Sequence, residues 1–130
     1  EILGYAYAGT FKDRAAYDWS VETTIYVKQD ARRKGVGGQL YTALERALCE
    51  MGIKNMNACI ASTEQEDEHL TNDSYYFHKK MGFELVGTFH QSGYKFDRWY
   101  DMIWMEKLIG THDVPAEKVA FPNEGKLAKA

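Results

Sequence analysis

The first part of the chain alternates between apolar and polar residues with the two-residue period of β-strands. Residues 2–8 are apolar and aromatic and lead into a polar stretch, which predicts a strand followed by a loop. Residues 19–27 carry the strongest strand pattern of the sequence, because β-branched and aromatic side chains dominate them. Alternation places Val21, Thr23, Ile25 and Val27 on one face of that strand and Glu22, Thr24 and Tyr26 on the other.

A helical period replaces the strand period after residue 38. Residues 28–38 are polar, basic and rich in glycine, and they break the alternation. Beyond them apolar side chains recur at helical spacing until Gly52, which predicts the end of a helix. This stripe consists of Leu40, Ala43, Leu44, Ala47, Leu48 and Met51. Residues 53–61 then predict a further strand, with Met56, Ala58 and Ile60 on one face.

A short helix is predicted in the second half of the chain. Residues 62–70 are acidic and turn-like, and residues 64–68 within them form the only charge run of the sequence. Asn72 or Asp73 provides an N-cap for a helix over residues 74–81, whose lysines near the C-terminal end suit the helix dipole.

A hairpin and a tail complete the predicted elements. Residues 83–89 and 99–108 predict two strands, joined by a loop over residues 90–98. From residue 111 onward apolar residues are scattered and both prolines occur. We therefore expect residues 110–130 to form a loosely docked C-terminal tail.

Length and composition fit one compact domain. The chain has 130 residues, of which 45% are hydrophobic and 27% charged. Its 3 Trp, 9 Tyr and 6 Phe argue against disorder, because ring carbon buried in a core offsets the entropy of ordering. With a net charge of -3, the chain lacks the positive electrostatic field that attracts nucleic-acid phosphates, so we expect no nucleic-acid partner.

The sequence does not indicate membrane, metal or disulfide chemistry. No apolar run approaches the roughly 20 residues that cross a bilayer, so we expect a cytoplasmic protein with no membrane partner. Cys49 and Cys59 are too few for a disulfide scaffold and lack zinc-ligand spacing, so we expect reduced thiols and no metal. Glu1 leads almost directly into a strand without an initiator Met, which suggests an excised fragment or an incomplete chain.

The glycine-rich segment before the long helix has the parts of a phosphate-binding loop. Successive glycine amides can converge on an anion, and the start of a helix adds about half a positive charge. Arg32, Gly35 and Gly37 form the pattern R-x-x-G-x-G, in which basic residues precede the glycines, unlike in a P-loop or a dinucleotide-binding fold. The same residues also suit a turn that only redirects the chain.

Four blocks of sequence, in this order, resemble the GNAT superfamily of N-acetyltransferases and, within it, the phosphinothricin acetyltransferase group. They read YAYAGTFKDRAAYDWSVETTIYV, RRKGVGGQLYTAL, FHKKMGF and GYKFDRWYDM. The resemblance implies an α/β fold, the GNAT acyl-CoA N-acyltransferase fold, with a mixed twisted sheet and flanking helices. It spans residues 1–109, which we interpret as the acetyltransferase domain. This domain is N-terminally incomplete, because the family normally has a strand, two helices and another strand before it. The acidic insert at residues 62–70 is a second departure from the family.

The resemblance also implies an activity. Such an enzyme moves an acetyl group from acetyl-CoA, its co-substrate, to the primary amine of a small glutamate-like or methionine-like molecule. We expect a direct transfer in a ternary complex, because neither cysteine has a neighbouring base in the sequence that would make it a nucleophile. A homodimer is the assembly that the resemblance implies.

The cofactor contacts implied by the resemblance fall on the glycine loop and the strand before it. The backbone amides of residues 32–38 are expected to wrap the diphosphate while basic side chains balance its charge. The main-chain N–H of Val27 is expected to donate to the thioester carbonyl. Asn72 is expected to bond the cofactor arm, although it stands one residue out of step with the family. The full set is Tyr26, Val27, Arg32, Arg33, Lys34, Gly35, Val36, Gly37, Gly38 and Asn72.

Two residues are candidates for proton transfer. An unpaired carboxylate is costly to bury among apolar neighbours, so we expect Glu22 to line a cleft, where the resemblance makes it the general base. The alternative is a solvent-facing glutamate on a half-exposed sheet. His78 matches a histidine of the resembling group, which can assist the base or protonate the leaving sulfur, and a packing role is its alternative.

Substrate contacts are expected from the loop after the first strand. Two cations and a phenol suit a small dianion, although a solvated loop has the same composition. These residues are Lys12, Arg14 and Tyr17. The family builds the rest of the pocket and its subunit contact from a later block, which matches Tyr94, Lys95, Trp99 and Asp101.

Two other functions stay open. The enzyme could acetylate a polyamine, an aminoglycoside or a protein N-terminus, which an acidic groove built by residues 64–68 would favour. The chain could also be a non-catalytic CoA-binding fragment, since the absent front part of the domain would leave the strand at residues 2–8 exposed.

Overall fold

A computed structural model describes residues 2–32, 34–120 and 127–129 of the chain. The chain divides into two compact units. The first unit comprises Glu1–Met56 and Leu108–Ala130, and the second comprises Asn57–Lys107.

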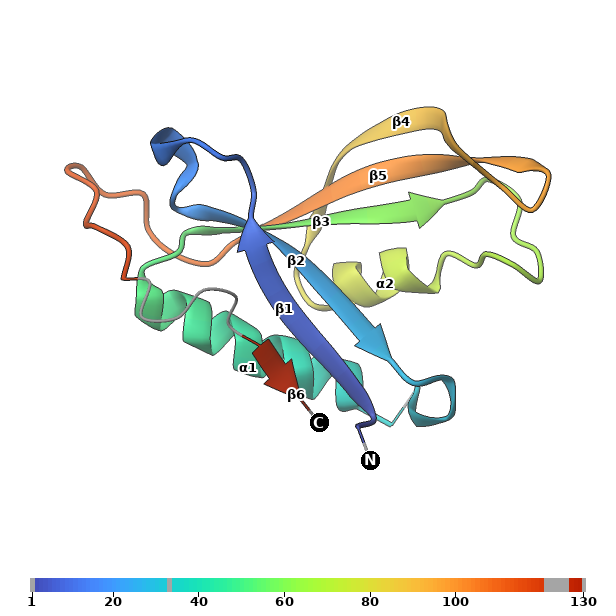
Figure 1. Cartoon of the computed structure of the whole chain (residues 1–130), viewed down its shortest axis with the longest axis horizontal. Coiled ribbons are helices and arrows are strands. Elements are labelled where there is room, and N and C mark those ends of the chain that lie inside the picture. Colours follow the sequence, from blue (N-terminus) through green and yellow to red (C-terminus); the bar gives the residue numbers. More distant parts are fainter. Residues whose placement is uncertain (1, 33, 121–126, 130) are drawn as a thin grey trace. The chain divides into compact units, whose positions relative to one another are not determined.

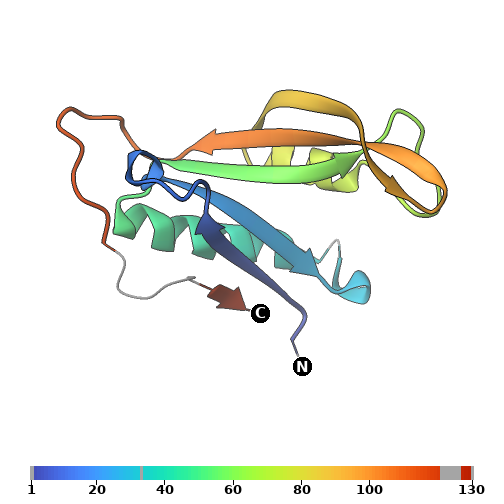
Figure 2. The same cartoon turned by 45° about the horizontal axis from the view of Figure 1, so that its top comes forward.

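The first unit is built on an antiparallel strand pair covered by a helix (Figures 1 and 2). Strand β1 (Gly4–Thr10) pairs with β2 (Ser20–Val27), from Gly4 opposite Val27 to Thr10 opposite Val21. Helix α1 (Val36–Met51) packs on one face of this pair. The 3-10 turns η1 (Ala15–Tyr17) and η2 (Gln29–Ala31) lie in the connections.

The core of the first unit follows the predicted alternation. The even residues of β1 up to Ala8 and the odd residues at the start of β2 are buried against the apolar stripe of α1. Gly4 allows β1 to lie close to β2, because a Cβ at this position would lie 2.6 Å from the carbonyl oxygen of Tyr26. The buried side chains include Ala6, Ala8, Val21, Leu40, Tyr41, Leu44, Leu48 and Met51. The stripe thus includes Tyr41, whereas Ala43 is exposed and does not belong to it.

The C-terminal tail is attached more firmly than its composition indicates. Strand β6 (Leu127–Lys129) pairs with the outer edge of β1 in antiparallel fashion. The Trp19 Nε1 group donates to the carbonyl of Glu117 at 2.7 Å, and the amide of Ala120 donates to the carbonyl of Met51 at 3.0 Å. These bonds involve the backbone of the tail, and a pattern of apolar side chains therefore gives no sign of them.

The second unit contains one helix and three strands in the order β4, β5, β3. Strand β3 (Asn55–Ser62) begins at the boundary between the units, and α2 (Asp73–Lys80) follows it. Strands β4 (Glu84–Lys95) and β5 (Arg98–Leu108) form an antiparallel hairpin.

The loop predicted at residues 90–98 is wrong, because both strands continue through most of it. Lys95 pairs with Arg98, which leaves a turn of only Phe96 and Asp97. Both turn residues have positive φ angles, 54° and 57°. Successive residues in this conformation are typical of tight hairpin turns, which usually show Asn-Gly or Asp-Gly. Phe-Asp lacks that signature, so a two-residue turn could not be predicted from these residue types.

The acidic insert is an ordered loop rather than a solvated charge run. The Asp67 carboxylate accepts the amides of His69 and Leu70 at 2.8 and 2.9 Å and forms an ion pair with Arg98 on β5. Burial opposes ionisation, but these partners outweigh it and hold the pKa of Asp67 below its ordinary value. The ion pair therefore joins the insert to the β4–β5 hairpin.

Candidate functional site

Helix α1 begins with backbone amides that have no acceptor among the residues that the structure describes. Gly35 is the N-cap, with a φ of 80° that favours glycine, and it provides no side-chain cap. The first intrahelical bond runs from the amide of Gln39 to the carbonyl of Gly35 at 3.1 Å. Among the described residues, none accepts a hydrogen bond from the amides of Val36, Gly37 or Gly38. Such a helix start can bind an anion.

The basic residues of the loop behave differently from one another. The Arg32 side chain turns back, so that its Nε donates to the carbonyl of Val27 at 3.3 Å and ties the loop to the end of β2. Lys34 is exposed. Arg33 lies outside the described residues.

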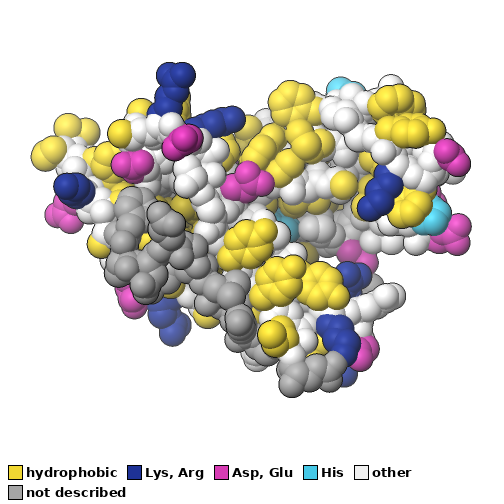
Figure 3. All heavy atoms as spheres, viewed as in Figure 1, with side chains coloured by type: hydrophobic (Ala, Val, Ile, Leu, Met, Phe, Trp, Pro, Cys, Tyr) yellow, Lys and Arg dark blue, Asp and Glu magenta, His cyan; other side chains and the backbone are white. Residues whose placement is uncertain are grey.

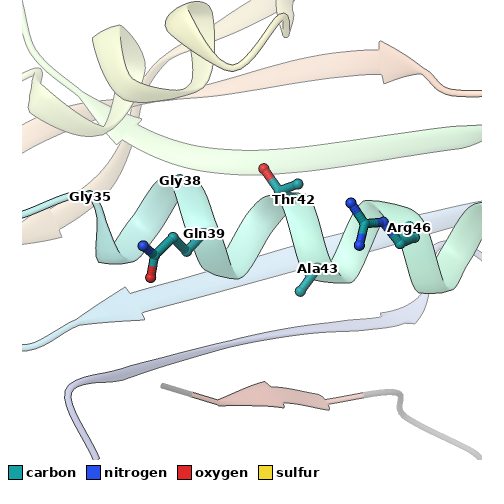
Figure 4. Close-up of a pocket in the computed structure, with 6 residues that line it drawn as sticks. All are labelled: Gly35, Gly38, Gln39, Thr42, Ala43 and Arg46. Atoms are coloured by element: carbon teal, nitrogen blue, oxygen red, sulfur yellow. The ribbon is translucent and has the colours of Figure 1, made fainter.

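A shallow pocket of about 400 Å³ continues from the loop along α1 (Figure 4). Its lining combines small residues with an amide, a hydroxyl and a guanidinium group. The residues are Gly35, Gly38, Gln39, Thr42, Ala43 and Arg46. The last four were not predicted as site residues, although steps of three or four positions, from Gly35 to Gln39, Gln39 to Thr42 or Ala43, and Thr42 or Ala43 to Arg46, place them on one face of the helix.

Glu22 lies on the face of the strand pair that turns away from α1. The hydroxyl groups of Thr23 and Tyr41 are 3.1 Å apart, which fixes the odd residues of β2 toward the helix. Glu22 is half-buried on the opposite face and stands directly across from Gly9. The burial of Val21 and Thr23 agrees with the alternation predicted for the start of β2, and it places Glu22 on the opposite face.

Tyrosine rings cover the same face farther along the strands. The rings of Tyr5 and Tyr26 are 5.4 Å apart and those of Tyr5 and Tyr7 are 6.1 Å apart, measured between centroids. Figure 3 shows hydrophobic side chains gathered over β1 and β2 on this face. All three rings are partly exposed, at 37–48%. Glu22 thus lies near one end of an aromatic surface that includes Tyr26.

The predicted substrate loop lies at the same end of the hairpin as Glu22. It joins Thr10 to Ser20, and Thr10 pairs with Val21, the residue before Glu22. The loop is compact, because the amide of Arg14 donates to the carbonyl of Lys12 and that of Tyr17 to the carbonyl of Arg14, both at 2.9 Å. The three candidate side chains are exposed there. The strand register therefore groups Glu22 with the cationic loop.

His78 and Asn72 belong to the second unit. His78 is 2% exposed, and its Nδ1 lies 2.7 Å from the carbonyl oxygen of Ser74. Because a carbonyl only accepts, Nδ1 carries the proton and Nε2 is the basic nitrogen of the neutral ring. Burial lowers the pKa of His78 below its ordinary value, against a smaller opposing effect of the Ser74 bond. The imidazole is therefore neutral near pH 7.

The depressed pKa of His78 predicts a loss of stability in mild acid. The unfolded chain protonates its histidine as the pH falls below about 6.5, while the folded protein resists until lower pH. The contribution of neutral His78 to the free energy of unfolding is thus complete above pH 6.5 and shrinks below it. We expect His78→Asn to reduce the stability lost between pH 7.5 and 5.5, as measured by urea unfolding. Parallel pH profiles for parent and variant would contradict this.

Asn72 holds the two ends of the acidic loop together. It occupies the predicted N-cap position of α2, but its side chain makes no cap bond. Instead its Oδ1 accepts the amide of Thr63 at 3.1 Å and its Nδ2 donates to the Thr63 carbonyl at 2.9 Å. This closure of the loop is a structural role that the sequence did not indicate.

The described residues contain neither a cluster of metal ligands nor a helix that could span a membrane. Within residues 2–32, 34–120 and 127–129, no three His, Cys, Asp or Glu side chains are grouped so that they could hold a metal ion. In the same residues, no helix has both the length and the apolar character needed to cross a membrane.

Comparison with known proteins gives a consistent result. The family model described as "Acetyltransferase (GNAT) domain" matches residues 1–104. Phosphinothricin N-acetyltransferase of Streptomyces viridochromogenes is 39% identical over 102 residues, which are 78% of this chain and 51% of that protein. The L-methionine sulfoximine/L-methionine sulfone acetyltransferase of Pseudomonas aeruginosa is 36% identical over 116 residues, 88% of this chain and 63% of that protein. The chain therefore spans about half to two thirds of these relatives.

A solved structure agrees with the sequence matches. It is the GNAT superfamily phosphinothricin acetyltransferase of Sinorhizobium meliloti in complex with AcCoA, at 35% identity and a TM-score of 0.76. The similarity covers 92% of this chain and 62% of that one. The α/β fold class predicted from the sequence is thereby confirmed.

Proposed function

Because the chain belongs to the GNAT acetyltransferase family, we propose that it transfers the acetyl group of acetyl-CoA to the primary amine of a small amino-acid-like molecule. The names of the two relatives support an acceptor such as phosphinothricin, methionine sulfone or methionine sulfoximine. The transfer is direct, without an acetylated enzyme residue.

The observation that carries this proposal is the start of α1, where three successive amides have no acceptor among the described residues. Their positive ends suit the diphosphate of CoA. Exposed Lys34 adds charge there, and Arg32 fixes the loop against Val27, whose amide donates to the thioester carbonyl. The pocket along α1 takes the nucleotide end, with Gln39 and Thr42 as hydrogen-bonding groups and Arg46 facing a phosphate.

Glu22 takes the proton from the amine of the acceptor. Acetyl-CoA supplies an activated carbonyl, which only a neutral amine attacks, so a base must remove a proton at neutral pH. Glu22 is half-buried and accessible from the open face of β1 and β2. Lys12, Arg14 and Tyr17 bind the carboxylate and the polar side-chain end of the acceptor. Their loop joins the strands at the Glu22 end, which supports one binding site for both ends of an amino acid.

His78 has a supporting role in proton transfer. Its Nε2 can accept a proton but cannot donate one while the ring is neutral and Nδ1 is bound to Ser74. This favours assistance to the base over protonation of the leaving sulfur. Asn72 contacts the cofactor arm through its second amide hydrogen or the second lone pair of its Oδ1. Its two bonds to Thr63 use only one donor and one acceptor site of the side chain.

A second acceptor class has one observation in its favour. A pocket of about 420 Å³ in the second unit includes Glu64, Asp101, His90 and Trp99 in its lining. Arg98 also lines it, but Asp67 balances the Arg98 charge, so the carboxylates leave the pocket suited to a cationic amine such as a polyamine.

A homodimer in the cytoplasm is the setting we propose. The β4–β5 hairpin exposes large apolar side chains that a second copy could cover, namely Leu85, Val86, Phe89, Tyr94, Phe96 and Trp99. Cys49 and Cys59 form no disulfide, which suits a reducing compartment.

The proposed function is tested by release of free thiol from acetyl-CoA. We expect the chain to release thiol with phosphinothricin and with L-methionine sulfone, but not with spermidine. Release with spermidine alone would favour the cationic acceptor instead. Thermal stabilisation by CoA without thiol release from any amine would identify a binding module and overturn the enzyme.

A further inference from the structure

Gly9 lies in the interior of β1, and its backbone conformation does not require glycine. Among the described residues, the glycines with positive φ are Gly35, Gly52 and Gly82, so Gly9 has a conformation that any residue adopts. Glycine in a strand is destabilising relative to alanine, because its unfolded state has more conformational freedom. Some other feature must therefore account for it.

Packing does not require glycine at this position either. A Cβ at Gly4, on the same strand, would meet the carbonyl oxygen of Tyr26 at 2.6 Å and the Leu40 side chain at 3.2 Å. A Cβ at Gly9 would have no described atom within 4 Å, apart from its chain neighbours. Gly4 thus makes room for the protein itself, whereas the space at Gly9 is open.

The open space lies directly beside the candidate base. Gly9 pairs with Glu22, and both belong to the face that turns away from α1. The Cβ atoms of directly opposed residues in an antiparallel pair lie about 4.5–5.5 Å apart, so a side chain at Gly9 would stand against the Glu22 carboxylate. Tyr7 is the next residue of β1 on this face, and the substrate loop begins two residues after Gly9. Strand glycines of this kind often mark the close approach of a ligand.

We propose that Gly9 determines acceptor specificity, because its missing side chain leaves the space in which the amine-bearing carbon of the acceptor lies against Glu22. This inference rests on the proposed function. It identifies the acceptor as an amine whose carbon approaches the strand backbone closely, with its carboxylate toward the cationic loop. A side chain at Gly9 displaces that carbon and leaves the cofactor loop, at the far end of β2, unchanged.

The test compares Gly9→Ala and Gly9→Val with Gly87→Ala and Gly87→Val. Gly87 is a matched control, since it also lies in a strand and a Cβ there would also meet nothing within 4 Å. We expect Gly9→Val to lower kcat/KM for L-methionine sulfone by about tenfold or more, because small displacements of a reacting group are costly. Gly9→Ala should have a smaller effect. Acetyl-CoA affinity by calorimetry and the melting temperature should match the parent in both Gly9 variants, and the Gly87 variants should keep the parent kcat/KM.

Two outcomes would overturn the inference while the proposed function stands. One is a Gly9→Val enzyme that acetylates as fast as the parent. The other is an equal loss of acetyl-CoA affinity and acceptor kcat/KM in Gly9→Ala, which would show a structural effect. A parent chain that acetylates no amine would overturn the proposed function and this inference together.

Discussion

Replacement of Glu22 by glutamine is expected to lower kcat about 10²- to 10⁴-fold at neutral pH, with little change in acetyl-CoA affinity. Glutamine keeps the size and hydrogen-bonding reach of glutamate but cannot accept the proton of the ammonium group. Glu22 lies on the open face of β2, five residues before Val27, so the substitution leaves the amides of α1 undisturbed. Thiol release at saturating substrates measures kcat, and calorimetry measures the affinity.

The pH dependence separates loss of a base from general damage. Without a base, the variant acetylates only the fraction of acceptor that is already neutral, so its rate should rise about tenfold per pH unit below the amine pKa. Glu84→Gln is the control, because Glu84 is a strand glutamate on exposed β4 with no assigned role. If Glu22→Gln transfers acetyl as fast as the parent at neutral pH, the base assignment fails and the cofactor assignment survives.

The parts of the fold that the sequence predicts are those with a regular period. The alternation in β2 and the apolar stripe of α1 each repeat over several residues, and the observed burial matches the start of β2 and most of the stripe, with Ala43 as an exception. The hairpin turn at Phe96 and Asp97 and the attachment of the tail depend on backbone conformation and backbone bonds. Residue types at those positions carry little information about either feature.

The candidate site also has features that local sequence patterns predict and features that depend on pairing in the folded chain. The R-x-x-G-x-G pattern is local, so it predicts a candidate phosphate-binding loop directly, and alternation places Glu22 on the open face. The open space at Gly9 depends on which residue of β2 stands across from it, and the tautomer of His78 depends on a carbonyl in the preceding turn. The ion pair of Asp67 with Arg98 joins residues that are 31 positions apart. Pairings of this kind follow from the folded register, which a single sequence does not specify.

Gly37→Asp is expected to lower the affinity for acetyl-CoA at least about 100-fold without unfolding the protein. Gly37 is the second residue of α1, where an acidic side chain suits the helix dipole and is a better helix former than glycine. The same charge would lie beside the diphosphate, and two like charges about 4 Å apart at an effective dielectric constant of 20 repel by about 4 kcal/mol. Calorimetric titration with acetyl-CoA measures the loss, and thermal unfolding checks the fold.

Gly37→Asn separates the charge of the new side chain from its size. Asparagine has nearly the shape of aspartate but no charge, so we expect it to weaken acetyl-CoA binding less than Gly37→Asp does. Equal losses in both variants would assign the effect to steric exclusion of the diphosphate from the helix start. An unchanged affinity in Gly37→Asp would mean that the amides of Val36, Gly37 and Gly38 do not hold the cofactor, because a carboxylate cannot share that position with a bound diphosphate at no cost.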